Sequence, residues 1–274
     1  MRSTDVSASS RSIHIVAREM PSQWLSAVEE FLFTHPCALC DRTLNGRNPS
    51  AADWRNACCE ACVAELDAPA RPGCRRCGAD VGPHLDRLSD CGFCRGERYR
   101  FTRTWRIGVY DGPLRHAVLK AKNDRHRALA RSLAGLLWER HGAAIGEERP
   151  AVVVPVPHLW WQSPWTLDRP ADLLAEELSA RLRVPQDEGL LRKVRWIRPQ
   201  TAMTPSGRRT NVRGAFVGDR RADLNGATVL LVDDVMTTGA TANACARSLE
   251  RIGAGKVLVA VFARGLGRRG MAGE

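Results

Sequence analysis

Short apolar runs alternate with segments of helical periodicity through the last two thirds of the chain. The apolar runs predict four strands, at residues 103–110, 151–156, 228–232 and 256–262. Apolar residues at helical spacing predict helices within residues 114–138, over residues 170–182 and from Ala240 onward. Strands without polar alternation are typical of a parallel sheet that is covered on both faces. The order of these elements predicts an α/β fold, with a mostly parallel sheet flanked by helices.

The segment TVLLVDDVMTTGAT, residues 228–241, ends one of these strands in a loop that suits a phosphate group. The strand is expected to stop at Asp233, so that residues 236–241 join its carboxyl end to the amino end of the next helix. Unpaired N–H groups and the positive end of the helix dipole meet at such a junction. A glycine allows close backbone approach there, and threonines add hydroxyl donors. These residues are Thr237, Thr238, Gly239 and Thr241.

Two adjacent carboxylates, Asp233 and Asp234, precede this loop. A phosphate would repel both of them, so we expect them to face a sugar diol or a metal ion. The alternative is structural: the two acids would form only a turn at the strand end, and Thr241 only a helix cap.

Eight of the ten cysteines form four C-x-x-C pairs before residue 95. Each such turn points two thiolates at one centre, and two turns complete a tetrahedral zinc site. The simplest, sequential pairing predicts two zinc ions; an interleaved pairing, a disulfide framework and free thiols are the alternatives. The segment has few large apolar side chains, so its fold is expected to depend on the metal. The predicted ligands are Cys37, Cys40, Cys59 and Cys62 for one ion, and Cys74, Cys77, Cys91 and Cys94 for the other.

The chain is expected to have four parts. Residues 1–20 are polar and predicted to be disordered, and residues 21–98 hold a short amphipathic helix and the cysteines. Residues 99–266 form the sheet domain, and residues 267–274 a tail. A membrane-surface role for the amphipathic helix is the less favoured interpretation.

The charge favours a polyanionic partner such as nucleic acid, because 41 Lys and Arg residues oppose 30 Asp and Glu residues, a net charge of +11. Most of the excess is arginine, so a compositional bias of the genome is an equal explanation. No apolar run approaches the roughly 20 residues that span a bilayer, which predicts no membrane insertion and a cytoplasmic protein.

The loop resembles the phosphoribosyl pyrophosphate (PRPP) loop of type I phosphoribosyltransferases. The resemblance implies that the loop holds the 5′-phosphate of the ligand and that the paired acids accept hydrogen bonds from the ribose hydroxyls. In an active enzyme, Mg²⁺ would bridge the pyrophosphate. The implied ligand-binding residues are Asp233, Asp234, Met236, Thr237, Thr238, Gly239, Ala240 and Thr241.

From about residue 28 to residue 264 the chain resembles the ComF family, in which zinc ribbons precede a phosphoribosyltransferase-like domain. The resemblance rests on the order and spacing of FLFTHPCALC, VYDGPLRHAVLKAK, VVPVP, LLRKVRWIRPQTAMTPSGRRTNVRGAF, the PRPP loop and GAGKVLVAVFAR. It implies a role in DNA uptake during natural competence and in the use of external DNA, with competence or recombination proteins as partners.

One segment departs from the family pattern. After PVP, family members usually carry several basic residues and a phrase close to RGFNQ, where an active transferase binds pyrophosphate. Here the segment is HLWWQSPWTLDRP, in which Arg169 is the only Lys or Arg, and Trp160, Trp161 and Trp165 occupy the expected basic positions. One nearby cation stabilises a pyrophosphate leaving group poorly, so the departure argues against transferase activity. The tryptophans suit either base stacking or a hydrophobic lid or dimer contact.

Basic residues surround a tryptophan in the segment before the loop. This mixture suits a groove for single-stranded DNA, although the same arginines could meet pyrophosphate in an enzyme. The nucleic-acid candidates are Arg192, Arg195, Trp196, Arg208, Arg209 and Arg213. A second basic cluster, which includes Lys120 and Lys122, is interpreted as a solvated helix face.

Two functions of different class follow from the sequence. The favoured one is a non-catalytic DNA-handling factor that keeps the phosphate site for a ligand. The alternative is an active nucleobase phosphoribosyltransferase in nucleotide salvage. No general base stands out, and neither the acceptor base nor the oligomeric state is predicted.

Overall fold

The computed structural model describes residues 35–44, 53–81, 91–123, 126–158, 169–195, 212 and 214–265 of the 274-residue chain. Several predictions therefore lie outside the described residues. These are the disordered start, the amphipathic helix, the three tryptophans after PVP and the tail.

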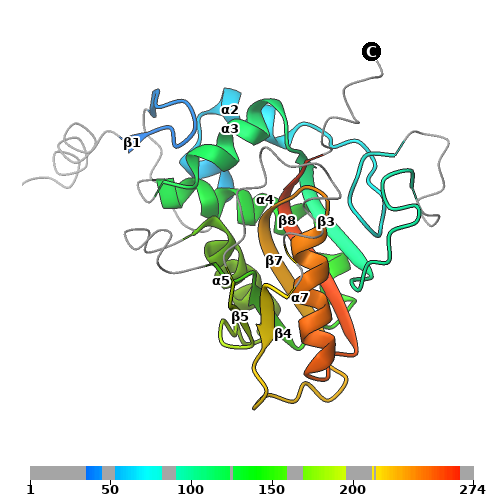
Figure 1. The fold of residues 1–274 in the computed structure, drawn as a ribbon. Coiled ribbons are helices and arrows are strands. Elements are labelled where there is room, and N and C mark those ends of the chain that lie inside the picture. The colour runs from blue at the N-terminus through cyan, green and yellow to red at the C-terminus, as the bar shows by residue number, and fades with distance from the viewer. Residues whose placement is uncertain are drawn as a thin grey trace, which may run out of the picture.

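A four-stranded parallel sheet forms the centre of the molecule (Figure 1). Its strand order is β3-β8-β7-β4. The strands are β3 (Arg103–Val109), β4 (Val152–Pro155), β7 (Thr228–Met236) and β8 (Lys256–Arg264). The two central strands, β7 and β8, are almost entirely buried, as their unbroken apolar sequences require. The predicted parallel α/β fold is confirmed.

Helices cover both faces of this sheet. The first face packs against α4 (Arg127–Gly146) and α5 (Pro170–Leu182), and the other against α7 (Ala240–Arg251) (Figure 1). Alternate residues of β7 enter the two cores: Leu230 and Val232 face α4 and α5, whereas Val229 and Leu231 face α7. The predicted bounds of α5 are confirmed.

Two sequence predictions about element ends were wrong. Strand β7 does not stop at Asp233 but continues to Met236, because Asp233, Val235 and Met236 still pair with residues of β8. The long helix expected within residues 114–138 is two helices. A short helix, α3 (Gly112–Lys120), comes first, and α4 then begins at Arg127 and extends to Gly146.

The first cysteines lie in and between small elements. These elements are β1 (His35–Pro36), β2 (Thr43–Leu44), η1 (Trp54–Ala57) and α2 (Glu60–Asp67). Of these, η1 packs against α4, and α2 packs against α3. Trp54 is buried against Gly135, where an added Cβ would lie 2.7 Å from the Cβ of Trp54. Metal is therefore not the only support of this region, since it shares the core of the sheet domain.

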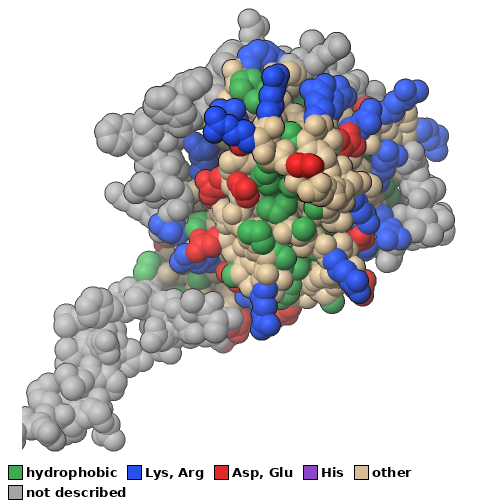
Figure 2. Space-filling view, turned by 90° about the horizontal axis from the view of Figure 1, so that it is seen from below, with side chains coloured by type: hydrophobic (Ala, Val, Ile, Leu, Met, Phe, Trp, Pro, Cys, Tyr) green, Lys and Arg blue, Asp and Glu red, His purple; other side chains and the backbone are tan. Residues whose placement is uncertain are grey.

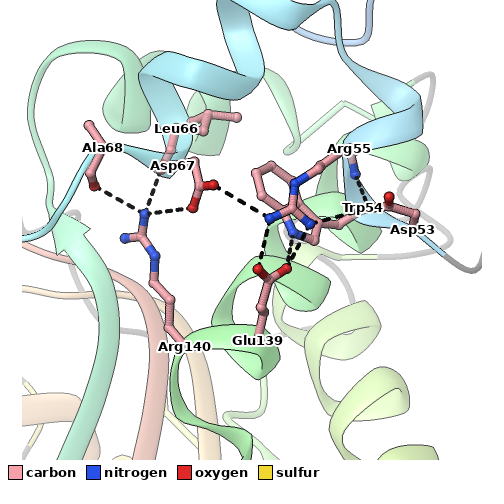
Figure 3. Close-up of polar contacts among 8 residues, drawn as sticks. All are labelled: Asp53, Trp54, Arg55, Leu66, Asp67, Ala68, Glu139 and Arg140. Carbon is pink, nitrogen blue, oxygen red and sulfur yellow. Dashed lines mark hydrogen bonds and ion pairs between the residues drawn. The ribbon is translucent and has the colours of Figure 1, made fainter.

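Polar contacts reinforce the same junction (Figure 3). Arg55 donates two hydrogen bonds to Glu139 of α4, at 2.7 and 2.8 Å, and the indole N–H of Trp54 donates a third at 2.7 Å. Arg140, the next residue of α4, donates to the carbonyls of Leu66 and Ala68 at the end of α2. A paired guanidinium and carboxylate of this geometry fix the orientation of η1 on α4.

A small antiparallel pair, β5 (Leu191–Lys193) and β6 (Phe216–Gly218), flanks α7. Figure 2 shows the end of the molecule at which the sheet strands begin. Hydrophobic atoms form a central stretch there, with both basic and acidic side chains around it, so this face is not uniformly basic. Within the described part of the chain, no helix has the length and apolar character needed to cross a bilayer.

Candidate phosphate loop and cysteine groups

The end of β7 and the start of α7 enclose the loop that the sequence singled out. Gly239 precedes the helix with φ of 75°, a left-handed conformation that favours glycine. An added Cβ at Gly239 would also lie 3.1 Å from the ring of Tyr99. The loop therefore passes close to a second segment of the chain. The hydroxyl of Thr238 accepts a hydrogen bond from the N–H of Ala240 at 3.3 Å, which holds the first turn of the helix.

The paired carboxylates at the end of β7 have different environments. Asp233 is 9% exposed, and its Oδ1 accepts a hydrogen bond from the N–H of Asp234. Burial raises the pKa of Asp233 well above its usual range, and the neighbouring charge of Asp234 adds to this effect.

Asp234 forms an ion pair with Lys122, at 2.6 Å between Oδ2 and Nζ. Burial alone would raise the pKa of Asp234, but the positive charge and hydrogen bond of Lys122 outweigh it and hold this pKa below its usual range. The interpretation of Lys122 as part of a solvated helix face was wrong, because it lies against the site. Lys120 also has partners, the carbonyl of Leu39 and the carboxylate of Asp41.

Buried polar contacts connect the loop to the second cysteine segment. The hydroxyl of Tyr99 donates to the carbonyl of Thr238 at 2.9 Å. Arg264, only 2% exposed, donates from Nε to the carbonyl of Cys77 at 2.7 Å and from Nη1 to the carbonyl of Met236 at 3.2 Å. One guanidinium thus bridges the cysteine turn and the first residue of the loop.

The structure gathers the eight cysteines into two groups in the sequential pairing. Within each group all four sulfur atoms lie within 4.8 Å of one another, as tetrahedral coordination by four thiolates requires. No described cysteine forms a disulfide. We call the set Cys37, Cys40, Cys59 and Cys62 the first group, and the set Cys74, Cys77, Cys91 and Cys94 the second group.

Hydrogen bonds favour the thiolate form of one cysteine in each group. Burial alone would raise the pKa of Cys37, but hydrogen bonds from backbone N–H groups, including those of Cys40 and Cys59, lower it to about 6. A hydrogen bond from the thiol of Cys77, with further backbone donors, lowers the pKa of Cys74 to about 4. Metal ligation requires the thiolate form, which these two cysteines favour, whereas burial raises the pKa of Cys62 and Cys94.

The two remaining cysteines have no such role in the structure. Cys58 is buried beside the first group but is not one of its four gathered sulfurs, and burial raises its pKa to about 12. Cys245 is fully buried on α7, as expected for a small core thiol.

The predicted nucleic-acid residues are only partly described. Arg192 lies exposed on β5, and Arg195 follows that strand. The other four candidates, Trp196, Arg208, Arg209 and Arg213, lie outside the described residues. The described residues therefore do not test this set, and the DNA groove stays a prediction.

The sequence reasoning missed three residues around the loop: Lys122, Tyr99 and Arg264. Each of them reaches the loop from a distant part of the chain, so spacing within the motif could not reveal it. One signal was present for Arg264, a charged residue placed directly after eight residues of a buried strand, because such a charge needs buried acceptors.

Comparisons with known proteins agree with this geometry. A model of the phosphoribosyl transferase domain matches residues 166–272, which include α5, β7, the loop and β8. The chain is 32% identical to DNA utilization protein YhgH of Salmonella typhi over 200 residues, covering 70% of this chain and 84% of that protein. The chain belongs to the ComF family. It is also 27% identical to Competence protein F of Haemophilus influenzae, covering 77% of this chain and 91% of that protein. These alignments are too long to lie within the matched domain alone, so the ComF likeness extends beyond it.

Proposed function

We propose that this ComF-family protein binds PRPP or another ribose 5-phosphate ligand at residues 236–241 and acts in the uptake or use of DNA. The observation that supports the ligand is the loop itself. A left-handed Gly239 at the amino end of α7 follows a strand that carries two carboxylates in its last four residues. The printed names of the relatives, a competence protein and DNA utilization proteins, support the role.

The loop and the carboxylates would divide the ligand between them. N–H groups at the amino end of α7 and the threonine hydroxyls would hold the 5′-phosphate. Asp234 stays ionised and would accept hydrogen bonds from the ribose hydroxyls, in competition with Lys122. Asp233, whose raised pKa favours the protonated form, would add a donor beside it.

The described surroundings favour binding over transfer. His158 lies at the end of the PVP segment, and burial together with the charge of Arg169 lowers its pKa to about 4. It is therefore neutral near pH 7. The same two effects, burial and the charge of Arg169, lower the pKa of Lys193. Among the described residues, neutral His158 therefore adds no positive charge beside the carboxylates that would stabilise departing pyrophosphate.

The cysteine groups would hold zinc as a structural ion. Four thiolates complete its coordination and leave no open position for substrate, so zinc would cross-link the turns. Among the described residues, the groups suited to a metal are these two, and the geometry gives no comparable argument for Mg²⁺.

Binding of single-stranded DNA is the second part of the proposal. It rests on the net charge of +11 and on the basic segment that begins at Arg192. Salt-sensitive binding of a single-stranded oligonucleotide would support it, and binding indistinguishable from that of a neutral polymer would contradict it.

Calorimetry with PRPP and ribose 5-phosphate tests the ligand. The double variant Asp233→Asn, Asp234→Asn should lose affinity for both ligands while its circular dichroism is unchanged. The matched control is Asp219→Asn, a carboxylate that caps a turn after β6, and it should bind as the wild type does. Unchanged affinity in the double variant would contradict the proposal. Release of pyrophosphate on adding PRPP with a panel of bases would instead establish the transferase.

A further inference from the structure

A second basic cavity lies at the β3 edge of the sheet and shares no residue with the phosphate loop. Its volume is about 510 Å³, within the range of small-molecule sites. The walls come from residues 70–78, which include the first turn of the second cysteine group, from β3 and from the end of α4. Its basic lining residues are Arg71, Arg75, Arg103, Arg106, Arg140 and His141.

The lining contains five arginines and no carboxylate. Three of these arginines have acidic partners outside the lining: Arg106 with Asp80, Arg103 with Glu148 and Arg140 with Asp67. These pairs hold the guanidinium groups in place. Arg71 and Arg75 are exposed at the rim, and neither side chain pairs with an acid in the described part of the chain. The cavity therefore carries an excess of positive charge.

Two buried donors of the lining residues have no acceptor among the described residues. They are Nε1 of Trp105 and Nη1 of Arg106, from side chains that are 4% and 6% exposed. Buried N–H groups are almost always hydrogen-bonded in folded proteins. The two residues are neighbours on a strand, so their side chains leave opposite faces of the sheet. Both residues line the cavity, but these two donor atoms are themselves covered, so the exposed guanidinium groups of Arg71 and Arg75 are the ones that a ligand meets first.

Phosphate is the ligand chemistry that fits these donors. Guanidinium groups, such as those of Arg71 and Arg75 at the rim, bind phosphate oxygens through paired N–H donors. We infer that this cavity binds a phosphate-bearing ligand of nucleotide size, independently of the phosphate loop. The source is either a free nucleotide or the terminal nucleotide of a DNA strand, which present the same group.

The test uses the zinc-loaded full chain and calorimetry with deoxyadenosine 5′-monophosphate. Binding should persist in the variant Asp233→Asn, Asp234→Asn, because that change removes only the loop site. Adding Arg71→Gln and Arg75→Gln to this background should weaken binding by about tenfold or more, as expected when phosphate contacts are lost. The matched control, Arg220→Gln with Arg221→Gln, changes two exposed arginines of a turn after β6 and should leave affinity unchanged.

A second arm identifies the source of the phosphate. Oligonucleotides with and without a 5′-phosphate are compared on the same variants. Tighter binding of the phosphorylated strand that disappears with Arg71→Gln and Arg75→Gln would assign the site to a strand end. Binding of the mononucleotide alone would assign it to a free nucleotide. Absence of both, or equal loss in the control variant, would overturn the inference.

Discussion

The two cysteine groups have the same ligand set but different neighbours. The first group lies with Trp54 in the core that α4 and α5 share, and its Cys40 is exposed. The second group is fully buried in the core that α7 covers. It is also bonded, through Arg264 and the nearby Tyr99, to the phosphate loop.

The two groups therefore differ in role: the first belongs to the anchoring of the amino-terminal elements, and the second to the positioning of the phosphate loop. The first group lies among amino-terminal elements that an ion pair and a buried indole fasten to α4 (Figure 3). The second group fixes the position of the Cys77 carbonyl. Arg264 is hydrogen-bonded both to that carbonyl and to the carbonyl of Met236, so the position of the cysteine turn constrains the start of the loop. Loss of either ion should destabilise the chain, but loss of the second should also disturb the loop.

The largest effect is expected from Cys77→Ser. Losing a ligand of a buried site should remove about one zinc per chain, measured by metal analysis, and weaken PRPP binding. The paired variant Cys62→Ser should lose a similar amount of zinc but keep PRPP affinity in the folded fraction. Equal loss of PRPP affinity in both variants would contradict the comparison.

Trp54→Ala tests the anchoring of the first group. Removing a buried indole from a core costs about 3–5 kcal/mol of unfolding free energy. Urea unfolding should show this loss, whereas calorimetry on the folded variant should show unchanged PRPP affinity. Arg131→Gln, on an exposed turn of α4, is the control and should change neither quantity. A variant as stable as the wild type would refute the anchoring.

Arg264→Lys tests the positioning role of the buried guanidinium. A lysine keeps the charge but lacks the planar guanidinium that bonds the carbonyls of Cys77 and Met236 at the same time. PRPP affinity should therefore fall by about tenfold. Tyr99→Phe removes one hydrogen bond to the loop and should weaken the free energy of PRPP binding by about 1 kcal/mol or less. If Arg264→Lys weakened stability without any change in PRPP affinity, the guanidinium would be only a structural element.

A smaller effect is expected from the pH dependence of stability. The pKa of Asp233 is raised in the folded chain, so its folded form binds a proton that the unfolded form has released. Its contribution to stability is present below the ordinary carboxyl pKa and is lost as pH rises toward the folded pKa. Asp233→Asn should therefore lose less stability than the wild type as pH rises above the ordinary carboxyl pKa. Equal losses in urea unfolding would contradict the raised pKa.

The sequence predicted the parts that depend on local patterns. The bounds of α5, the strand and helix around the loop, and the four C-x-x-C turns follow from periodicity and spacing. It could not predict that β7 continues past Asp233, because that continuation depends on pairing with β8. Nor could it predict the Lys122–Asp234 pair or the packing of Trp54 on Gly135, since these contacts join residues more than 80 positions apart.

A crystal structure with ribose 5-phosphate is the most direct test of the account. It should show the phosphate held by the N–H groups of residues 237–241, with the ribose hydroxyls against Asp234. The bond between Arg264 and the carbonyl of Met236 should be intact. A ligand bound elsewhere, with carbonyl oxygens of the loop turned toward the expected phosphate position, would contradict the central claim.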